Sequence, residues 1–213
     1  MGMNLFFQFF AGIPMEETDQ LPLLPLGRWI LPVGIYILMS GFYLGADRKN
    51  RRFVMVRYVR VRKWWKNYFL KNMLYGGLVA VSLLFLGGFA ATLTSQKLPG
   101  KPEEIIQILL LWTVHGMMLL ALFLVMDITK IRNSVPAVLL LLEGMTFLYG
   151  YRNKMTACYM FGTWGMYAQS SFYDCTYGFS AVCVIGLQLI GIAGCYILGS
   201  RMLMKKEDVT LGA

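Results

Sequence analysis

The chain has 213 residues, of which 57% are hydrophobic and only 15% are charged, and its mean hydropathy is +0.57. A soluble globular domain has about 25% charged and 45–50% apolar residues. This composition therefore excludes an ordinary soluble domain and indicates a protein that lies in a lipid bilayer. The net charge is +9, and the Lys and Arg residues are concentrated in a few segments between the apolar runs.

The N-terminal stretch 1–14, MGMNLFFQFFAGIP, is apolar but too short for a standard membrane span, which needs about 20 residues. It has neither the basic start nor the small-residue cleavage site of a signal peptide. We expect residues 1–24 to contain a short first span, which gives six crossings. The alternative is an interfacial helix on the outer face, which gives five.

Five longer apolar runs follow. Membrane spans contain about 17–25 mostly apolar residues, and these runs reach that length alone or with their flanks. They also lack the polar face of a helix in a soluble protein. We therefore predict an all-α integral membrane protein, a single transmembrane domain over 1–213 with five or six helices. The predicted spans are 31–46, 73–96, 105–126, 134–151 and 177–200.

Lys and Arg residues predict the orientation, because short cytoplasmic loops carry an excess of them. Ten lie in 47–72, two in 129–133 and three in the tail from residue 201. The alternate segments 97–104 and 151–176 hold two each, offset by acidic residues. We predict that 47–72, 127–133 and the C-terminus are cytoplasmic in a multi-pass protein.

The segment 47–72 is too long for a simple hairpin between two spans. A strand there would leave its backbone unpaired at the membrane surface, so we expect a helix with basic residues beside a partly apolar stripe. Anionic lipid attracts such a helix by about 1 kcal/mol per basic residue, which makes nucleic acid the weakest partner. The expected contact residues are Phe53, Val56, Arg57, Val59, Arg60, Lys63 and Trp64.

One histidine, His115, and one acidic residue, Glu143, lie inside predicted spans. An intramembrane acid is a functional candidate by default, although it can equally be a packing device bonded to a neighbouring helix. With this single histidine we expect neither a Ser–His–Asp set nor a zinc site built from several histidines. Walker and GxGxxG sequences are missing as well, so we expect no enzyme activity, no metal and no cofactor in this chain.

Cys158 and Cys175 both fall in the predicted outer segment 152–176. A disulfide is chemically allowed there, and free thiols are the alternative. Their spacing does not decide between the two.

The order of these parts resembles the permease subunit of type-2 ABC exporters, particularly the small forms of Gram-positive bacteria linked to peptide or bacteriocin efflux and immunity. FVMVRYVRVRKWWKNYFLKN (53–72) resembles the family's cytoplasmic coupling helix. ACYMFGTWGMYAQSSF (157–172) resembles its outer re-entrant helical element, and GSRMLMKKEDV (199–209) its C-terminal tail. The resemblance covers the chain from about residue 25 and departs from the family at the N-terminus, where the first span is short or missing.

The resemblance implies a bacterial plasma-membrane protein that exports a peptide or another amphipathic or hydrophobic substrate. ATP would be bound by separate ABC ATPase subunits, which would contact the 53–71 helix. The remaining partners would be membrane lipids and a second permease subunit, identical or homologous. A non-transporting scaffold or accessory subunit of a larger membrane complex is the alternative function, and it predicts that no ATPase binds.

Overall fold

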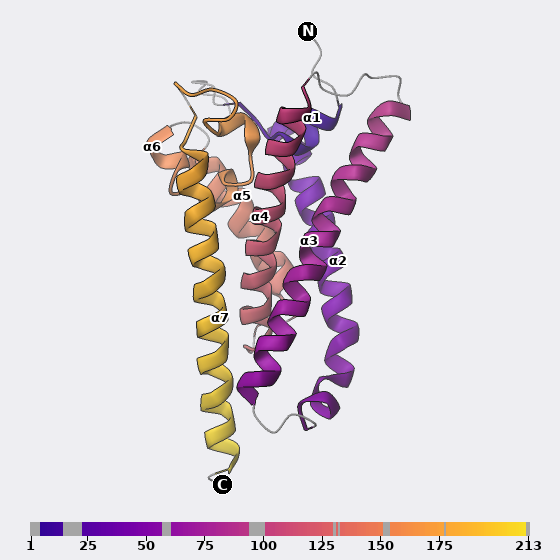
Figure 1. The fold of residues 1–213 in the computed structure, drawn as a ribbon, viewed down its shortest axis with the longest axis vertical. Coiled ribbons are helices and arrows are strands. Elements are labelled where there is room, and N and C mark those ends of the chain that lie inside the picture. The colour runs from indigo at the N-terminus through magenta and orange to yellow at the C-terminus, as the bar shows by residue number, and fades with distance from the viewer. Residues whose placement is uncertain are drawn as a thin grey trace.

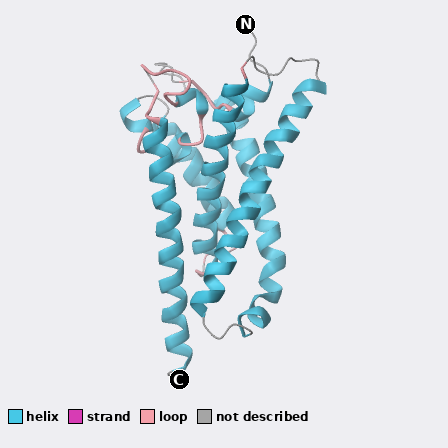
Figure 2. Cartoon of the chain, viewed as in Figure 1, coloured by secondary structure: helices cyan, strands magenta, loops and turns pink. Residues whose placement is uncertain are grey.

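The computed structural model describes residues 5–14, 23–56, 61–93, 101–129, 131, 133–150, 154–176 and 178–211. In this part of the chain the secondary structure is helical, apart from one isolated bridge between Ser170 and Phe179 (Figure 2). The elements are α1 (Leu5–Phe10), α2 (Leu23–Val56), α3 (Val61–Leu93), α4 (Pro102–Asp127), α5 (Val135–Gly150), α6 (Lys154–Ala157), the 3-10 helices η1 (Phe161–Thr163) and η2 (Tyr167–Gln169), and α7 (Ala181–Leu211).

The long helices form a bundle whose axes follow the long dimension of the molecule (Figure 1). Four are long and apolar enough to cross a membrane, namely α2, α3, α4 and α7, and α5 is a shorter apolar helix of 16 residues. Each of the five predicted spans falls on one of these helices. The prediction of an all-α membrane-embedded helical bundle is confirmed.

The predicted short first span is wrong. The N-terminal helix α1 has six residues and is about 9 Å long at 1.5 Å per residue, whereas the hydrocarbon core is about 30 Å thick. Phe6, Phe10 and Ala11 are buried, and the Ala11 carbonyl accepts a 2.8 Å hydrogen bond from the amide of Ala168. The apolar N-terminal residues therefore pack inside the protein at one end of the bundle. The six-crossing arrangement is wrong too, because the described residues contain four helices long enough to cross and one shorter apolar helix.

Helix α4 lies at the centre of the bundle. It packs against α2, α3, α5 and α7. In its most apolar stretch 72% of the residues are buried, compared with 39% or less in the corresponding stretches of the other three long helices. Those helices expose large apolar side chains such as Phe42, Phe85 and Ile190. An outer surface of this kind suits lipid as the surrounding solvent.

Glycines allow α7 to approach α3 and α4 closely. A side chain at Gly191 would meet Met118 of α4, and one at Gly199 would meet the Trp65 ring of α3. The Trp65 indole nitrogen also donates a 2.9 Å hydrogen bond to the Tyr196 carbonyl of α7. Packing and polar contacts of this type drive the association of helices in membranes. The hydrophobic effect does not drive it there, because the lipid tails are as apolar as the side chains.

The predicted separate helix over 53–71 is wrong. Helix α2 continues to Val56, and α3 begins at Val61, so the basic stretch is divided between the ends of two long helices. The physical reason lies in the aromatic residues at the start of α3, where Trp64, Trp65, Tyr68 and Phe69 are buried. Phe69 packs edge-on against Tyr196 of α7 at 5.4 Å between ring centroids. We refer to the end of the bundle where α2 ends and α3 begins as the basic end.

The Gly199 contact gives a stability prediction. Gly199→Leu should force the new side chain into the Trp65 ring and destabilise the fold by about 1–3 kcal/mol. Gly27→Leu is the matched control, because Gly27 is an exposed residue of α2 and nothing lies within 4 Å of a Cβ there. Thermal melting of the purified variants in detergent measures both. Equal melting temperatures for the two variants would contradict the close α3–α7 contact.

Candidate functional site

A buried polar network joins α2, α4 and α5. The Trp29 indole nitrogen donates a 3.0 Å hydrogen bond to Glu143 Oε1, and His115 Nε2 lies 3.1 Å from the same oxygen. All three residues are 0% exposed. We call Trp29, His115 and Glu143 the Glu143 network.

The network lies deep within the bundle. His115 is near the middle of α4 (Pro102–Asp127), about 18–20 Å from either helix end at 1.5 Å per residue. Ionisable side chains at such depth are energetically costly and, when present, face the bundle interior and pair with one another. His115 and Glu143 follow this rule.

The two network atoms without a hydrogen-bond partner in the described part of the chain are Glu143 Oε2 and His115 Nδ1. An isolated buried charge is strongly unfavourable, so the pair is stable when it is neutral as a unit. The contacts of Trp29 and His115 with Glu143 Oε1 therefore give α2, α4 and α5 a shared polar centre whose members each need a buried partner.

The chain between α5 and α7 dips into the bundle and covers the network. A side chain at Gly162 would meet the Glu143 carbonyl, and one at Gly165 would lie 2.9 Å from the His115 ring. The Phe161 ring is 4.9 Å from the His115 ring between centroids. Glu143 is seven residues before the end of α5 at Gly150, which is about 10 Å along the helix.

The predicted re-entrant element is therefore present, and it consists of two short 3-10 helices and turns. We call residues 154–176 and 178–180 the re-entrant segment; it lies at the end of the bundle opposite the basic end (Figure 1). Backbone groups that enter a membrane must be satisfied within the protein. Several bonds do this: the Gly162 amide donates to Thr146 Oγ1 at 2.8 Å, and Thr163 Oγ1 donates to the Ala157 carbonyl at 2.7 Å.

Side chains also anchor the re-entrant segment to α7 and to itself. Gln188 Nε2 of α7 donates to the Trp164 carbonyl at 3.3 Å, and the Trp164 indole nitrogen donates to the Cys158 carbonyl at 3.0 Å. The Phe179 amide donates to the Gln169 carbonyl at 2.9 Å. The segment is thus a built structure that holds its glycines against α4 and α5.

At the basic end, the predicted contact residues separate into two groups. Lys63 is exposed, as are its neighbours Arg62 and Lys66. Trp64 is only 4% exposed and stacks on Tyr68 with centroids 4.9 Å apart. It packs within the chain, and an anchor for a partner protein does not fit its position.

Of the other predicted contact residues, Phe53 and Val56 belong to the last turns of α2. Arg57, Val59 and Arg60 lie outside the described residues.

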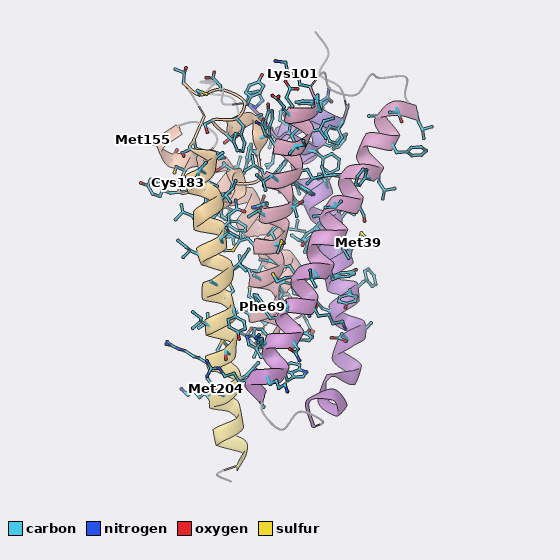
Figure 3. All side chains as sticks on the ribbon, in the orientation of Figure 1. Met39, Phe69, Lys101, Met155, Cys183 and Met204 are labelled. Atoms are coloured by element: carbon cyan, nitrogen blue, oxygen red, sulfur yellow. The ribbon has the colours of Figure 1, made fainter. Side chains whose placement is uncertain are left out.

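The sequence left a disulfide or free thiols open for Cys158 and Cys175, and the structure has all four cysteines as free thiols. The Cys175 thiol donates a 3.3 Å hydrogen bond to the Ser171 carbonyl. Burial and the neighbouring Cys183, near the start of α7, raise the pKa of the Cys158 thiol. Figure 3 labels Cys183 on that part of α7.

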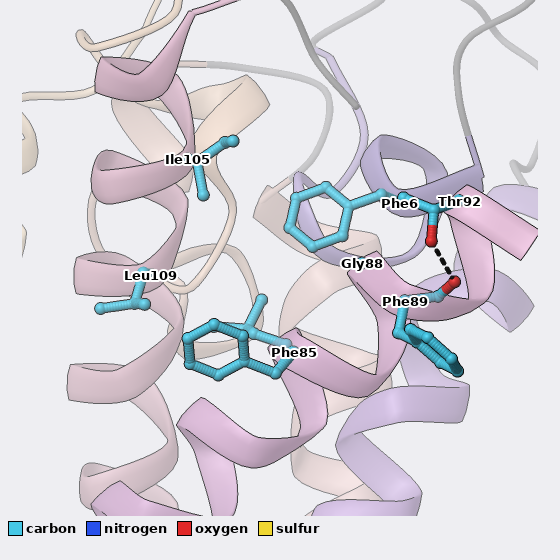
Figure 4. A pocket seen from close by; sticks show the side chains of 8 residues that line it. Phe6, Phe85, Gly88, Phe89, Thr92, Ile105 and Leu109 are labelled. Atoms are coloured by element: carbon cyan, nitrogen blue, oxygen red, sulfur yellow. Dashed lines mark hydrogen bonds between the residues drawn. The ribbon is translucent and has the colours of Figure 1, made fainter. Parts of the chain in front are cut away.

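An apolar cavity of about 420 Å³ lies between α1, α3 and α4 (Figure 4). Its one hydroxyl, on Thr92, donates a 2.7 Å hydrogen bond to the Phe89 carbonyl and is therefore already satisfied. The cavity suits an apolar group. It is lined by Phe6, Leu84, Phe85, Gly88, Phe89, Thr92, Ile105 and Leu109.

Comparisons with models of protein families, with curated proteins and with solved structures give no match for this chain. The interpretation of the site therefore depends on its own geometry.

The Glu143 network predicts energetic coupling between α4 and α5. Glu143→Leu and His115→Leu should each destabilise the protein by about 1–3 kcal/mol, because each leaves a buried polar group without its partner. The double variant should cost less than the sum of the two, with a coupling energy of about 0.5–2 kcal/mol. Denaturation of the four proteins in detergent measures this cycle, and additive effects would show that the two side chains do not interact.

Proposed function

We propose that this chain is the membrane-spanning permease subunit of an ATP-driven transporter of the type-2 ABC exporter kind. Its cargo would be a peptide or another amphipathic or hydrophobic molecule, and separate ATPase subunits would supply the energy. One observation supports this proposal above others. The basic junction of α2 and α3 and the re-entrant segment before α7 lie at opposite ends of one helical bundle (Figure 1), in the order that such permeases have.

The basic end has the properties of a site that receives movement from a partner. Arg62, Lys63 and Lys66 project from the start of α3 without burial. The same turns hold Trp65, which is 1% exposed and bonded to α7. A force applied to the exposed charges would therefore act on α3 and α7 together, and α3 continues for 33 residues, about 50 Å.

The proposed orientation places the basic end and the C-terminus in the cytoplasm of a bacterial cell, where the ATPase and ATP are. The re-entrant segment and the cavity beside α1 would then lie toward the outer face. The apolar lining of that cavity suits the apolar part of an amphipathic cargo. Lipid acyl chains would contact the same outer surface of the bundle.

A second permease subunit, identical or homologous, belongs to the proposed assembly. On α7, nothing lies within 4 Å of a Cβ at Gly186 or at Gly194, and neighbouring apolar residues such as Leu189 and Ile190 are exposed. Small residues on an exposed apolar helix allow another transmembrane helix to approach closely. This part of α7 is the surface that we expect the second subunit to use.

The docking role is tested by charge reversal at the basic end. We expect affinity purification of the wild-type chain from native membranes to recover an ATPase. The triple variant with Arg62→Glu, Lys63→Glu and Lys66→Glu should recover about tenfold less ATPase. Each exposed charge contributes roughly 0.2–1 kcal/mol to binding, and 1.4 kcal/mol is tenfold in affinity. Identification and quantification of the co-purified proteins by mass spectrometry measures the loss.

The matched control is Lys101→Glu, because Lys101 is an exposed lysine at the opposite end of the bundle. It should leave recovery of the ATPase unchanged. Equal recovery with the triple variant would remove the basic end as the docking site. If the wild-type chain recovers membrane proteins but no nucleotide-binding subunit, it is a scaffold or accessory subunit instead.

A further inference from the structure

We propose that Cys158 and Cys183 are a redox pair whose disulfide covalently links the re-entrant segment to α7. This site is independent of the proposed function, since it concerns the chemistry of two thiols whatever the bundle carries. Three features of the structure support it, and each is taken in turn below.

The first feature is proximity. Cys158 packs against the small cluster that contains Val184, the residue after Cys183, although 25 positions separate the two cysteines in the sequence. Cys183 also lies close enough to contribute, after burial, to the raised pKa of the Cys158 thiol. A disulfide requires Cβ atoms about 3.5–4.5 Å apart and suitably directed side chains, which two neighbouring cysteines reach by a small local movement.

The second feature is the packing of their neighbours in sequence. Ala157, Phe179 and Val184 form a small buried cluster, each at most 1% exposed, and Cys158 packs against it. Ala157 precedes Cys158 and Val184 follows Cys183, so burial of these apolar side chains brings the two backbones together. The proximity of the two cysteines is therefore a consequence of the fold around them.

The third feature is that hydrogen bonds fix each cysteine from its own side. The Cys158 carbonyl accepts the Trp164 indole N–H at 3.0 Å, and the Cys183 amide donates to Ser180 Oγ at 3.4 Å. Trp164 is in turn bonded to Gln188 of α7 through its carbonyl. These bonds hold the pair in register whether its thiols are reduced or joined.

The different exposure of the two thiols indicates the order of the reaction. Cys183 is exposed, while Cys158 is partly buried. Burial raises the pKa of the Cys158 thiol, and the neighbouring Cys183 raises it further. Because the thiolate is the nucleophile in exchange, Cys183 is the residue that attacks first.

The oxidant is a disulfide, either of a thiol–disulfide oxidoreductase or of a small molecule such as oxidised glutathione. The Cys183 thiolate attacks one of its sulfur atoms, which forms a mixed disulfide and releases the other sulfur as a thiolate. The Cys158 thiolate then attacks the Cys183 sulfur and displaces the second thiolate. Two electrons pass to the oxidant, which becomes two thiols and takes up the two protons that the cysteines lose.

The disulfide would close the loop from 158 to 183, which contains η1 and η2. This loop includes Gly162 and Gly165, which lie against α5 and α4 at Glu143 and His115. Oxidation would therefore keep the re-entrant segment seated on the Glu143 network and joined to α7. Reduction would leave hydrogen bonds and packing as the remaining connection.

The test uses the full-length chain in membrane vesicles, reduced with dithiothreitol, freed of reductant and then treated with oxidised glutathione. Remaining thiols are blocked with N-ethylmaleimide before a non-reducing digest. Trypsin would leave all three outer cysteines in one peptide, because no Lys or Arg lies between Lys154 and Arg201. Chymotrypsin separates them, since Tyr159, Tyr173 and Phe179 lie between them.

Mass spectrometry should find the Cys158 and Cys183 peptides joined, and the linkage should disappear in Cys158→Ser and in Cys183→Ser. Cys175→Ser is the matched control and should leave the linkage intact. The oxidised wild-type protein should melt roughly 5 °C or more above the reduced protein, as expected for a closed loop of this length. If both cysteines remain fully blocked by N-ethylmaleimide after the glutathione treatment, or if Cys158 joins Cys175, the proposal is wrong.

Discussion

The hydrogen bonds to Glu143 Oε1 are the interaction on which the arrangement of this bundle depends. An ionisable side chain at this depth requires partners, and Trp29 and His115 supply them from two other helices. The contacts bring α2, α4 and α5 together at a single point. The covering chain also comes close at this point, where glycines at 162 and 165 leave room beside the Glu143 carbonyl and the His115 ring.

The short α5 and the re-entrant segment solve one problem together. Helix α5 has 16 residues and is about 24 Å long, less than the roughly 30 Å of the hydrocarbon core. The re-entrant segment reaches the level of Glu143 and packs there beside α4 and α5. Its backbone is non-α-helical at that level, which is permitted only where protein surrounds it.

A second group of contacts holds the basic end. Lys71 of α3 lies 3.9 Å from the Asp47 carboxylate of α2 and over the Tyr43 ring, 5.7 Å from its centroid. The Trp65 bond to Tyr196 adds α7. Two clusters therefore connect the long helices at different depths, and α2 belongs to both. In the proposed transporter, a partner at the basic end would act on α3 and α7 first and reach the Glu143 network through α2 and α4.

The sequence predicted the parts of the fold that the bilayer itself dictates. Runs such as 105–126 are long and apolar because a span must be, and each corresponds to a helix. The N-terminal stretch was misassigned, because residues such as Phe6 and Phe10 have the same character in lipid and in a protein core. The 53–71 helix was misassigned because an amphipathic stripe does not distinguish a separate helix from the end of a long one.

The site depends on contacts that no spacing rule describes. His115 and Glu143 were named as candidates from their position in apolar runs, but their pairing joins residues 28 apart on two helices. Trp29 lies in an apolar run and was not named, since its indole donor is visible only once α2 packs on α5. The sequence offered Cys175 as a possible partner of Cys158 and did not name Cys183, because only the path of the re-entrant segment brings Cys158 close to the start of α7.

The central claim is that this chain is a permease driven by a nucleotide-binding partner. Native mass spectrometry of the complex released from its own membranes tests it most directly. We expect a mass that contains two permease subunits, at least one of them this 24.2 kDa chain, and two nucleotide-binding subunits. Adding a non-hydrolysable ATP analogue should increase that mass by bound nucleotide. The claim would be contradicted if the chain is released from the membrane as an isolated subunit, or in a complex that binds no nucleotide.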